Sequence, residues 1–504
     1  MFSIMKNKIM FKPVFLSVLI TLILTGCTKL LDKQPVTQVV RKTDSTSITA
    51  SDAEALILGV YGEYKGYSNG IEFNILDRVV NGDVIADNCY AGGDNPDNIT
   101  LDIFKANALN GNVTRDWADA YAMIGNANLA IAQVANCTDP ALLPQRKNEI
   151  LGESRFMRAF TYFDLVRLWG RVPLVLIPPD QTNSESLIKS VIIPQSSVDS
   201  VYDAILSDLW FAKATVGDIG ANPSKFIVSK GAVNAMLAKV YATRSPANWD
   251  SVAYYCDQVI PNYSMLSKFS YLWDNNHKDN SEAIWEMDFS GYGAGDEVGN
   301  WAPSIWVGGS EGDYEGGGWK KFNTPTNDLV NAFLAENDTV RLDNSVTFLD
   351  ITGQWTDPYW TNYTHYPFLT KYNDPANGIN DMYMIRLPDI MLLRAEAYNN
   401  NSDITDAAGL VNQVRARVGL PPTTAANQTD MALAIENERR LELAFEGQRW
   451  FDLLRTGRAI TVMNAQKDGN GNSLNYNVQP YQLLLPVPQT QLDLNPLLTQ
   501  NPGY

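Results

Sequence analysis

Two kinds of side chain in this chain of 504 residues have the chemistry to act on, or to hold, another molecule. The first kind is acidic. Glu442 and Glu446 lie four residues apart in a helical pattern, a spacing that puts two carboxylates on one helix face, where they could act as general acid and base. The second kind is aromatic. Four rings fall within one glycine-rich stretch: Trp301, Trp306, Tyr314 and Trp319.

Ion pairing explains the acidic pair better than catalysis does. Charges alternate in sign at spacings of three and four, so each acid has an arginine within helical reach. The residues concerned are Glu438, Arg439, Glu442, Glu446, Arg449, Asp452 and Arg455. Gly447 is expected to end or bend this stretch. We therefore expect a network that locks helices together. The alternative, a glycoside hydrolase, needs two carboxylates about 5 to 10 Å apart across a cleft, and the sequence contains no recognisable pairing motif.

The aromatic cluster is typical of a surface that binds sugars. A sugar ring has an apolar face of C–H groups and a rim of hydroxyls, so its site needs aromatic platforms beside polar side chains. Such groups surround the four rings: Asp296, Glu311, Asp313, Glu315 and Lys320. Loops lie on the surface and carry function more often than core, so a long loop rich in aromatics is unusual. The alternative is that these rings pack their own loop onto the body.

Counts and spacings exclude other chemistry. The two histidines, His277 and His365, are too few for a three-histidine metal site, and both are expected in loops or on the surface. A net charge of −17 argues against nucleic acid, which is bound through lysine and arginine. Residues 94–97 lack the spacing of a calcium loop and favour an Asx-turn, with a bound cation as the lesser alternative. We expect no cofactor, no metal and no catalytic residue.

The N-terminus has the pattern of an export signal. Lysines precede an apolar run over 14–24, which is too short to span a membrane and has the length of a signal peptide. The residues Leu24-Thr25-Gly26-Cys27 resemble a bacterial lipobox. This predicts a signal peptide over 1–26, lipidation of Cys27 and a polar tether over 27–50. A soluble secretion signal or a short anchor is the alternative. Cys89, Cys137 and Cys256 would remain, so at most one disulfide can form within the chain.

Helices must position these residues, because helical spacing of apolar residues dominates the chain. It predicts helices over 116–134, 143–169, 198–213, 230–243, 249–260, 326–335, 384–398, 406–418 and 430–454. A capping box from Ser51 to Glu54 predicts a further helix to about residue 67. Short strands are predicted at 283–287 and 483–487, with an extended run at 172–177. The predicted class is mostly α: one body over 51–504, with long irregular inserts at about 81–111 and 290–372.

A small motif recurs on the predicted helices. Alanine precedes tyrosine by three residues at 118/121, 159/162, 238/241 and 395/398. A small residue permits close helix approach while the tyrosine beside it fills the gap. This is similar to the helix hairpins of tetratricopeptide repeats, although no 34-residue period is visible. It favours a helical-repeat scaffold.

Several long motifs resemble the SusD/RagB family of surface lipoproteins. Residues 384–398 read MIRLPDIMLLRAEAY and resemble the family pattern R-L-x-D-x-x-L-x-x-A-E-A. Residues 436–455 read ENERRLELAFEGQRWFDLLR and resemble E-R-x-x-E-L-x-x-E-G-x-R-x-x-D-L-x-R. Residues 158–173, 230–241 and the C-terminal 485–504 are also similar. The resemblance therefore runs over essentially the whole chain.

The resemblance implies a fold, a location and a role. The body would consist of four tetratricopeptide-like hairpins, with a lobe of inserts that holds the ligand surface. Family members lie on the outer membrane at the cell surface as a lid on a SusC-like TonB-dependent transporter. They bind oligosaccharides, or peptides in RagB-like members, and none is known for chemistry on its ligand. The tryptophan-rich segment argues against a peptide here.

The family analogy also extends the set of candidate ligand contacts. It adds four residues of the first insert: Asp83, Tyr90, Asp94 and Asn95. Four other tryptophans lie on family helices or in a predicted strand and are expected in the core: Trp117, Trp169, Trp285 and Trp450. Three aromatics stay open between a glycan platform and contact with the transporter rim: Trp355, Tyr359 and Trp360.

Overall fold

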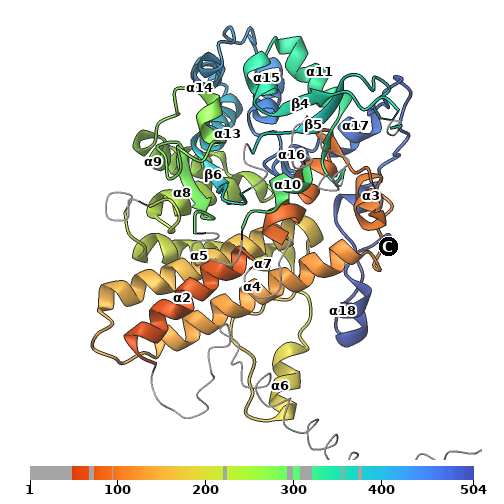
Figure 1. The fold of residues 1–504 in the computed structure, drawn as a ribbon. Helices are drawn as coiled ribbons and strands as arrows, with labels where there is room; N and C mark the ends of the chain where they lie inside the picture. The colour runs from red at the N-terminus through yellow and green to blue at the C-terminus, as the bar shows by residue number, and fades with distance from the viewer. Residues whose placement is uncertain are drawn as a thin grey trace, which may run out of the picture. The chain divides into compact units, whose positions relative to one another are not determined.

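The structure is a computed structural model, and it describes most of the chain. The described residues are 48–66, 73–93, 95–218, 224–291, 299–306, 321–353, 356–357, 359–372 and 377–504. Four of the predicted functional residues lie outside these ranges: Cys27, Asp94, Tyr314 and Trp319. Trp355 lies outside them as well. The predicted mostly helical class is confirmed (Figure 1). In the described ranges we find no helix with the length and hydropathy to cross a membrane.

Long helices packed in pairs form the scaffold. Helix α2 (Ala50–Tyr64) packs on α4 (Gly111–Ala135), and α4 packs on α5 (Pro144–Trp169), which in turn packs on α7 (Val198–Thr215). Two further hairpins follow along the chain (Figure 1): α8 (Lys230–Thr243) with α9 (Trp249–Val259), and α13 (Leu387–Asn400) with α14 (Ile404–Arg417). Helix α13 also contacts α9 and α15 (Gln428–Glu442). The four tryptophans expected in the core are all buried.

The N-cap of the first helix lies two residues before the predicted one. Thr49, not Ser51, is the N-cap, and its hydroxyl accepts a hydrogen bond from the backbone N–H of Asp52. The Asp52 carboxylate accepts one in return from the N–H of Thr49 at 2.9 Å. The prediction of a capping box at Ser51 and Glu54 was therefore wrong, because Thr49 and Asp52 form the reciprocal pair two residues earlier.

The predicted helix over 430–454 is two helices. Helix α15 ends at Glu442, and α16 (Arg449–Arg455) begins after a turn in which Phe445 and Gly447 both have positive φ. A Cβ on Gly447 would lie 2.6 Å from the Arg78 carbonyl oxygen. Gly447 thus lies in the turn that separates the two helices, and its lack of a Cβ allows another backbone to come close.

Short antiparallel strand pairs connect distant segments. Strand β2 (Ala283–Met287), predicted from its alternation, pairs with β6 (Met382–Arg386), which leads directly into α13. The helix predicted over 384–398 therefore begins at Leu387, three residues later than predicted. The predicted strand at 483–487 was wrong. Residues 480–483 form a 3₁₀ turn, and Pro486 within the segment has no N–H for a strand ladder.

The two inserts form one lobe. Strand β1 (Cys89–Tyr90) pairs with β3 (Thr324–Pro325), and the Gly92 N–H donates to the Lys321 carbonyl at 2.7 Å. Strands β4 (Val346–Leu349) and β5 (Tyr366–Leu369) form a second pair. Helix α3 (Pro96–Asp102) belongs to the first insert, and helices α10 (Ala302–Trp306) and α11 (Asn327–Glu336) belong to the second. We call these elements the insert lobe.

Candidate functional site

Tyr90 lies inside the insert lobe rather than on its surface. Its side chain is 1% exposed and stacks on Tyr359 with ring centroids 3.9 Å apart and planes 11° apart. Its hydroxyl lies 2.8 Å from the hydroxyl of Tyr366, which donates to Asp357 at 2.7 Å. A ligand on the surface cannot reach this ring. Its position makes Tyr90 a support that holds the first insert against the second.

Asp83 is also buried, with 0% exposure. Its carboxylate accepts hydrogen bonds from Asn88 Nδ2 at 2.7 Å and from the backbone N–H of Gly447 at 2.6 Å. Burial raises the pKa of Asp83 to about 6, against the opposing effect of these hydrogen bonds. Asp83 thus ties the first insert to the turn between α15 and α16, and no surface ligand can contact it.

Trp301 and Trp306, the two described tryptophans of the predicted aromatic cluster, differ in exposure. Trp306 is 2% exposed and packs against Tyr372, with ring centroids 5.4 Å apart. Trp301 is half-buried just before α10. The segment is held in place by Asn300, whose backbone N–H donates to the Gly378 carbonyl and whose Nδ2 donates to the Asn380 carbonyl. Burial removes Trp306 from any surface site, whereas Trp301 is partly exposed.

Asn95 caps a helix and is partly exposed at the surface. It is the N-cap of α3, and its Oδ1 accepts from the Asp97 N–H at 2.9 Å. The Asx geometry expected near residues 94–97 is therefore centred on Asn95. In the described ranges, no group of three or more His, Cys, Asp or Glu side chains is arranged to hold a metal ion.

Tyr359 and Trp360, which the sequence left open between a glycan platform and contact with the transporter, pack within the insert lobe. The Trp360 indole is buried, and its Nε1–H donates to the Pro325 carbonyl at 2.9 Å. Tyr359 is half-buried and stacks on Tyr90. Trp360 therefore holds β3, and Tyr359 covers Tyr90 of β1, so both rings contribute to the packing of the insert lobe.

Glu442 lies in a buried network of ion pairs. Its carboxylate contacts Arg386, Arg417 and, at 3.1 Å, Arg341. Burial alone would raise the pKa of Glu442, but the three arginines hold it well below its ordinary value. Glu446 is paired with Lys371 at 2.6 Å and with Arg386 at 2.7 Å. The predicted ion-pair network is confirmed.

Asp452 pairs with Arg455 of its own helix, as expected, but the partners of Glu442 and Glu446 differ from those expected. Helical spacing pointed to arginines of the same segment, yet those that contact Glu442 come from α12 (Thr339–Asp343), β6 and α14. Glu446 lies in the turn after α15, so the i to i+4 geometry does not apply to it. Both acids are occupied by cations and buried, an arrangement that does not suit acid–base catalysis.

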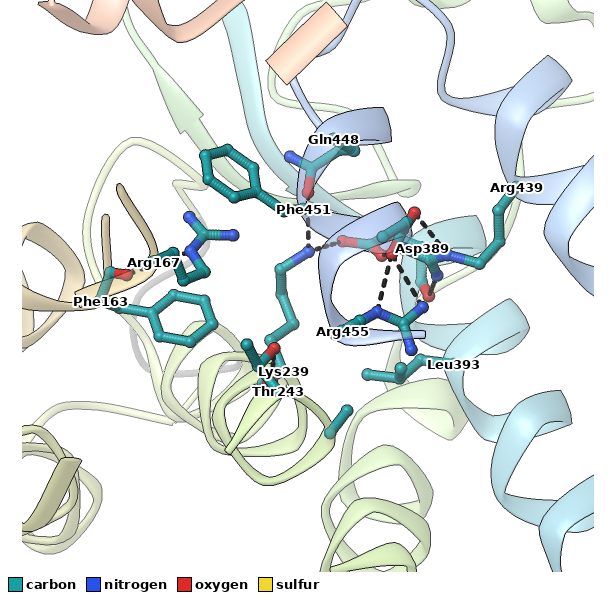
Figure 2. A pocket seen from close by; sticks show the side chains of 12 residues that line it. Phe163, Arg167, Lys239, Thr243, Asp389, Leu393, Arg439, Gln448, Phe451 and Arg455 are labelled. Atoms are coloured by element: carbon teal, nitrogen blue, oxygen red, sulfur yellow. Dashed lines mark hydrogen bonds and ion pairs between the residues drawn. The ribbon is translucent and has the colours of Figure 1, made fainter. Parts of the chain in front are cut away.

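A second charged cluster surrounds a very small cavity. Figure 2 shows Lys239 reaching Asp389 and Gln448, with Arg439 and Arg455 beyond them. The cavity measures about 20 Å³, which is room for about one water molecule. Arg439 Nη2 donates to Asp389 at 2.7 Å. This cluster joins α8, α13, α15 and α16, and its cavity is too small for a substrate.

Comparison with known proteins decides the family. Residues 350–504 match the SusD family, and residues 31–242 match a family described as starch-binding and associating with the outer membrane. The chain belongs to the SusD/RagB family. SusD-like protein P2 of Formosa agariphila is 28% identical, with 98% of this chain and 99% of that protein covered. A SusD-like protein of Bacteroides ovatus is 23% identical, with 91% and 92% covered.

Solved SusD structures share the fold of this SusD-like chain. A SusD superfamily protein from Bacteroides vulgatus has a TM-score of 0.75 at 23% identity, with 90% of this chain and 99% of that one covered. A laminarin binding SusD-like protein has a TM-score of 0.73 at 25% identity, with 90% and 100% covered. The mostly helical class and the family predicted from the sequence are thus both confirmed.

Proposed function

We propose that this SusD-like chain is a cell-surface lipoprotein that captures an oligosaccharide and passes it, unaltered, to a SusC-like TonB-dependent transporter. Lipid on Cys27 would anchor it in the outer membrane. Two comparisons support a glycan ligand: one matched family is described as starch-binding, and a solved relative is described as laminarin binding.

Trp301 carries the proposal within the structure. It is the described tryptophan of the second insert that keeps partial exposure, and it lies immediately before the segment that contains Tyr314 and Trp319. We propose that these three rings, with Asp94 and Asn95 of the first insert, form the ligand surface. Asp83, Tyr90 and Trp306 would act beneath it as supports.

Affinity electrophoresis of the full-length protein in gels containing laminarin or soluble starch tests this function. We expect retarded migration in at least one polysaccharide and loss of most of the retardation in Trp301→Ala. A matched control is Tyr254→Ala, which removes a ring that is 53% exposed on α9, outside the insert lobe. Incubation with the same glycans should release no shorter products. Release of products would contradict a binding role, and retention of a peptide library in place of glycans would indicate a RagB-like ligand.

A further inference from the structure

We propose that the helical scaffold carries a second saccharide site, in a groove centred on Trp249. Two neighbouring hollows, of about 580 and 640 Å³, have Ala247 and Trp249 in both of their linings. Each falls in the range of about 300–1,000 Å³ that is typical of small-molecule sites. We call the two hollows together the Trp249 groove.

The groove lies where three parts of the scaffold meet. The turn 244–248 between α8 and α9 forms its centre, the C-terminal end of α13 forms one wall, and residues of α15 and α16 form another. Figure 1 shows α8 and α9 at the left, well apart from α3 of the insert lobe at the right. No described residue of the insert lobe lines either hollow, so the groove is separate from the ligand surface proposed above.

Two aromatic rings of the groove, Tyr241 and Trp249, are partly buried and pack against the core. Tyr241 lines one hollow and stacks on Tyr255, with ring centroids 5.7 Å apart and planes 8° apart. Trp249 opens α9 directly after the N-cap Asn248, whose backbone N–H donates to the Tyr241 carbonyl at 3.0 Å. Rings held in this way lose little conformational entropy when a flat ligand face stacks on them.

Polar groups beside these rings remain available to hydroxyls. Arg244, Asp250 and Asn401 line the same hollow, and their side chains make no hydrogen bond or ion pair with other described residues. They combine a cationic donor, an anionic acceptor and an amide that can do both. Aromatic faces flanked by such groups match the C–H faces and hydroxyl rim of a sugar.

The other hollow supplies a buried oxygen that has no partner. Asn399 lines it with 5% exposure, and its Oδ1 has no hydrogen-bond partner among the described residues. Its Nδ2 donates to the Gln428 carbonyl at 3.0 Å. A buried polar atom without a partner costs free energy, and a ligand hydroxyl that reached this oxygen would remove that cost.

Charge pairing in the groove favours a neutral ligand. Arg455 is bound to Glu396 at 2.7 Å, and Arg458 to Glu436 at 3.0 Å, so these walls present little net charge to an anion or a cation. The centre of a protein interface is usually apolar, whereas most of the residues that line this groove have polar side chains. A neutral, hydroxyl-rich saccharide therefore fits better than a peptide or a partner protein.

A second site would change how the protein holds long chains. Once one segment of a polysaccharide is bound, a second segment binds at a raised effective concentration. The pair of sites would thus retain a polymer more strongly than a short oligosaccharide. This inference goes beyond the capture and transfer proposed above.

Calorimetric titration of the full-length protein, with laminarin- and starch-derived oligosaccharides as probes, tests the Trp249 groove. We expect two binding sites per chain in the wild type and one in each of Trp249→Ala and Trp301→Ala. Trp249→Phe, which keeps a platform, should retain the second site with reduced affinity. Tyr254→Ala, on the same helix but in the lining of neither hollow, should leave both sites intact. Retention of laminarin or starch polymer in gels should fall about tenfold or more in Trp249→Ala.

The outcomes separate this inference from the proposed function. If Trp249→Ala leaves stoichiometry and affinity unchanged while Trp301→Ala loses binding, the groove proposal is overturned and the insert-lobe site stands. If only Trp249→Ala loses binding, the groove stands and the insert-lobe site falls. If Trp249→Ala keeps both glycan sites but no longer co-purifies with the transporter, the groove is a protein interface and the proposal is wrong. Absence of any glycan binding in the wild type overturns both. Equal melting temperatures will show that the variants fold.

Discussion

At the residue scale, the buried acids of this protein serve structure in two opposite ways. Glu442 is ionised among three arginines, whereas burial raises the pKa of Glu286 to about 8, with further repulsion from Asp381. Neutralising the first removes a carboxylate that three buried arginines share, and neutralising the second relieves an unfavourable charge. Replacing Glu442 should therefore lower the stability of the fold, and replacing Glu286 should raise it.

Glu442→Gln should lower the free energy of unfolding by about 3–5 kcal/mol, because it breaks buried ion pairs with three arginines at once. Denaturant unfolding at pH 7 measures this. Glu185→Gln is the matched control, because its ion pair with Lys189 is exposed on both sides and should contribute less than about 1 kcal/mol. Equal effects of the two substitutions would show that the buried network does not stabilise the fold.

Glu286→Gln should change the pH dependence of stability. The folded pKa, about 8, lies above the ordinary value of 4.5, so the folded state binds a proton that the unfolded state releases. Stability is thus lost as pH rises from about 4.5 to about 8. Glutamine does not ionise, so it removes this pH-dependent loss of stability. Its side-chain oxygen can still accept the hydrogen bond that the Asp279 N–H donates to Glu286. We expect a variant that gains stability relative to wild type by a few kcal/mol over that range. Parallel melting curves from pH 4.5 to 8 for the two proteins would contradict the raised pKa.

At the element scale, the turn between α15 and α16 docks on the first insert. Gly82 and Gly447 face each other so closely that a Cβ on Gly82 would lie 2.2 Å from the Gly447 carbonyl carbon. The hydrogen bond from the Gly447 N–H to Asp83 fixes the same contact. The insert that the sequence assigned to ligand binding is therefore anchored on the helical signature of the family.

Gly447→Ala should cost at least about 2 kcal/mol, because strain at positive φ adds to a clash with backbone. Gly419→Ala is the matched control: its φ of +75° is similar to the +71° of Gly447, but nothing lies within 4 Å of its Cβ position. The control should therefore show the conformational cost alone, about 1 kcal/mol. Similar losses for the two variants would contradict the close docking of the turn.

Element boundaries show how far local pattern reaches. The helix predicted over 230–243 coincides with α8, because apolar periodicity and the Ser229 cap act within one segment. The helix predicted over 430–454 breaks at Phe445 and Gly447, where tertiary docking selects a turn. Local signals thus locate the helices, and contacts between segments decide where some of them end.

At the scale of the whole molecule, the proposed anchor sets where the protein works. Cys27→Ser should abolish lipidation and move the protein from the membrane fraction to the soluble fraction. Trp301→Ala, which leaves the lipobox intact, should remain with the membrane. Fractionation followed by immunoblotting measures both variants. Membrane association of Cys27→Ser equal to that of the wild type would contradict the lipid anchor.

The sequence by itself determined the helical class, the family and the core tryptophans, because periodicity and long motifs are local properties of the chain. Tertiary structure alone decided the roles of the insert residues. Asp83 meets Gly447 across 364 residues, and Tyr90 meets Tyr366 across 276. No local pattern encodes such pairings, so residues that looked available to a ligand became supports. The Trp249 groove likewise exists only where α8, α9, α13, α15 and α16 come together.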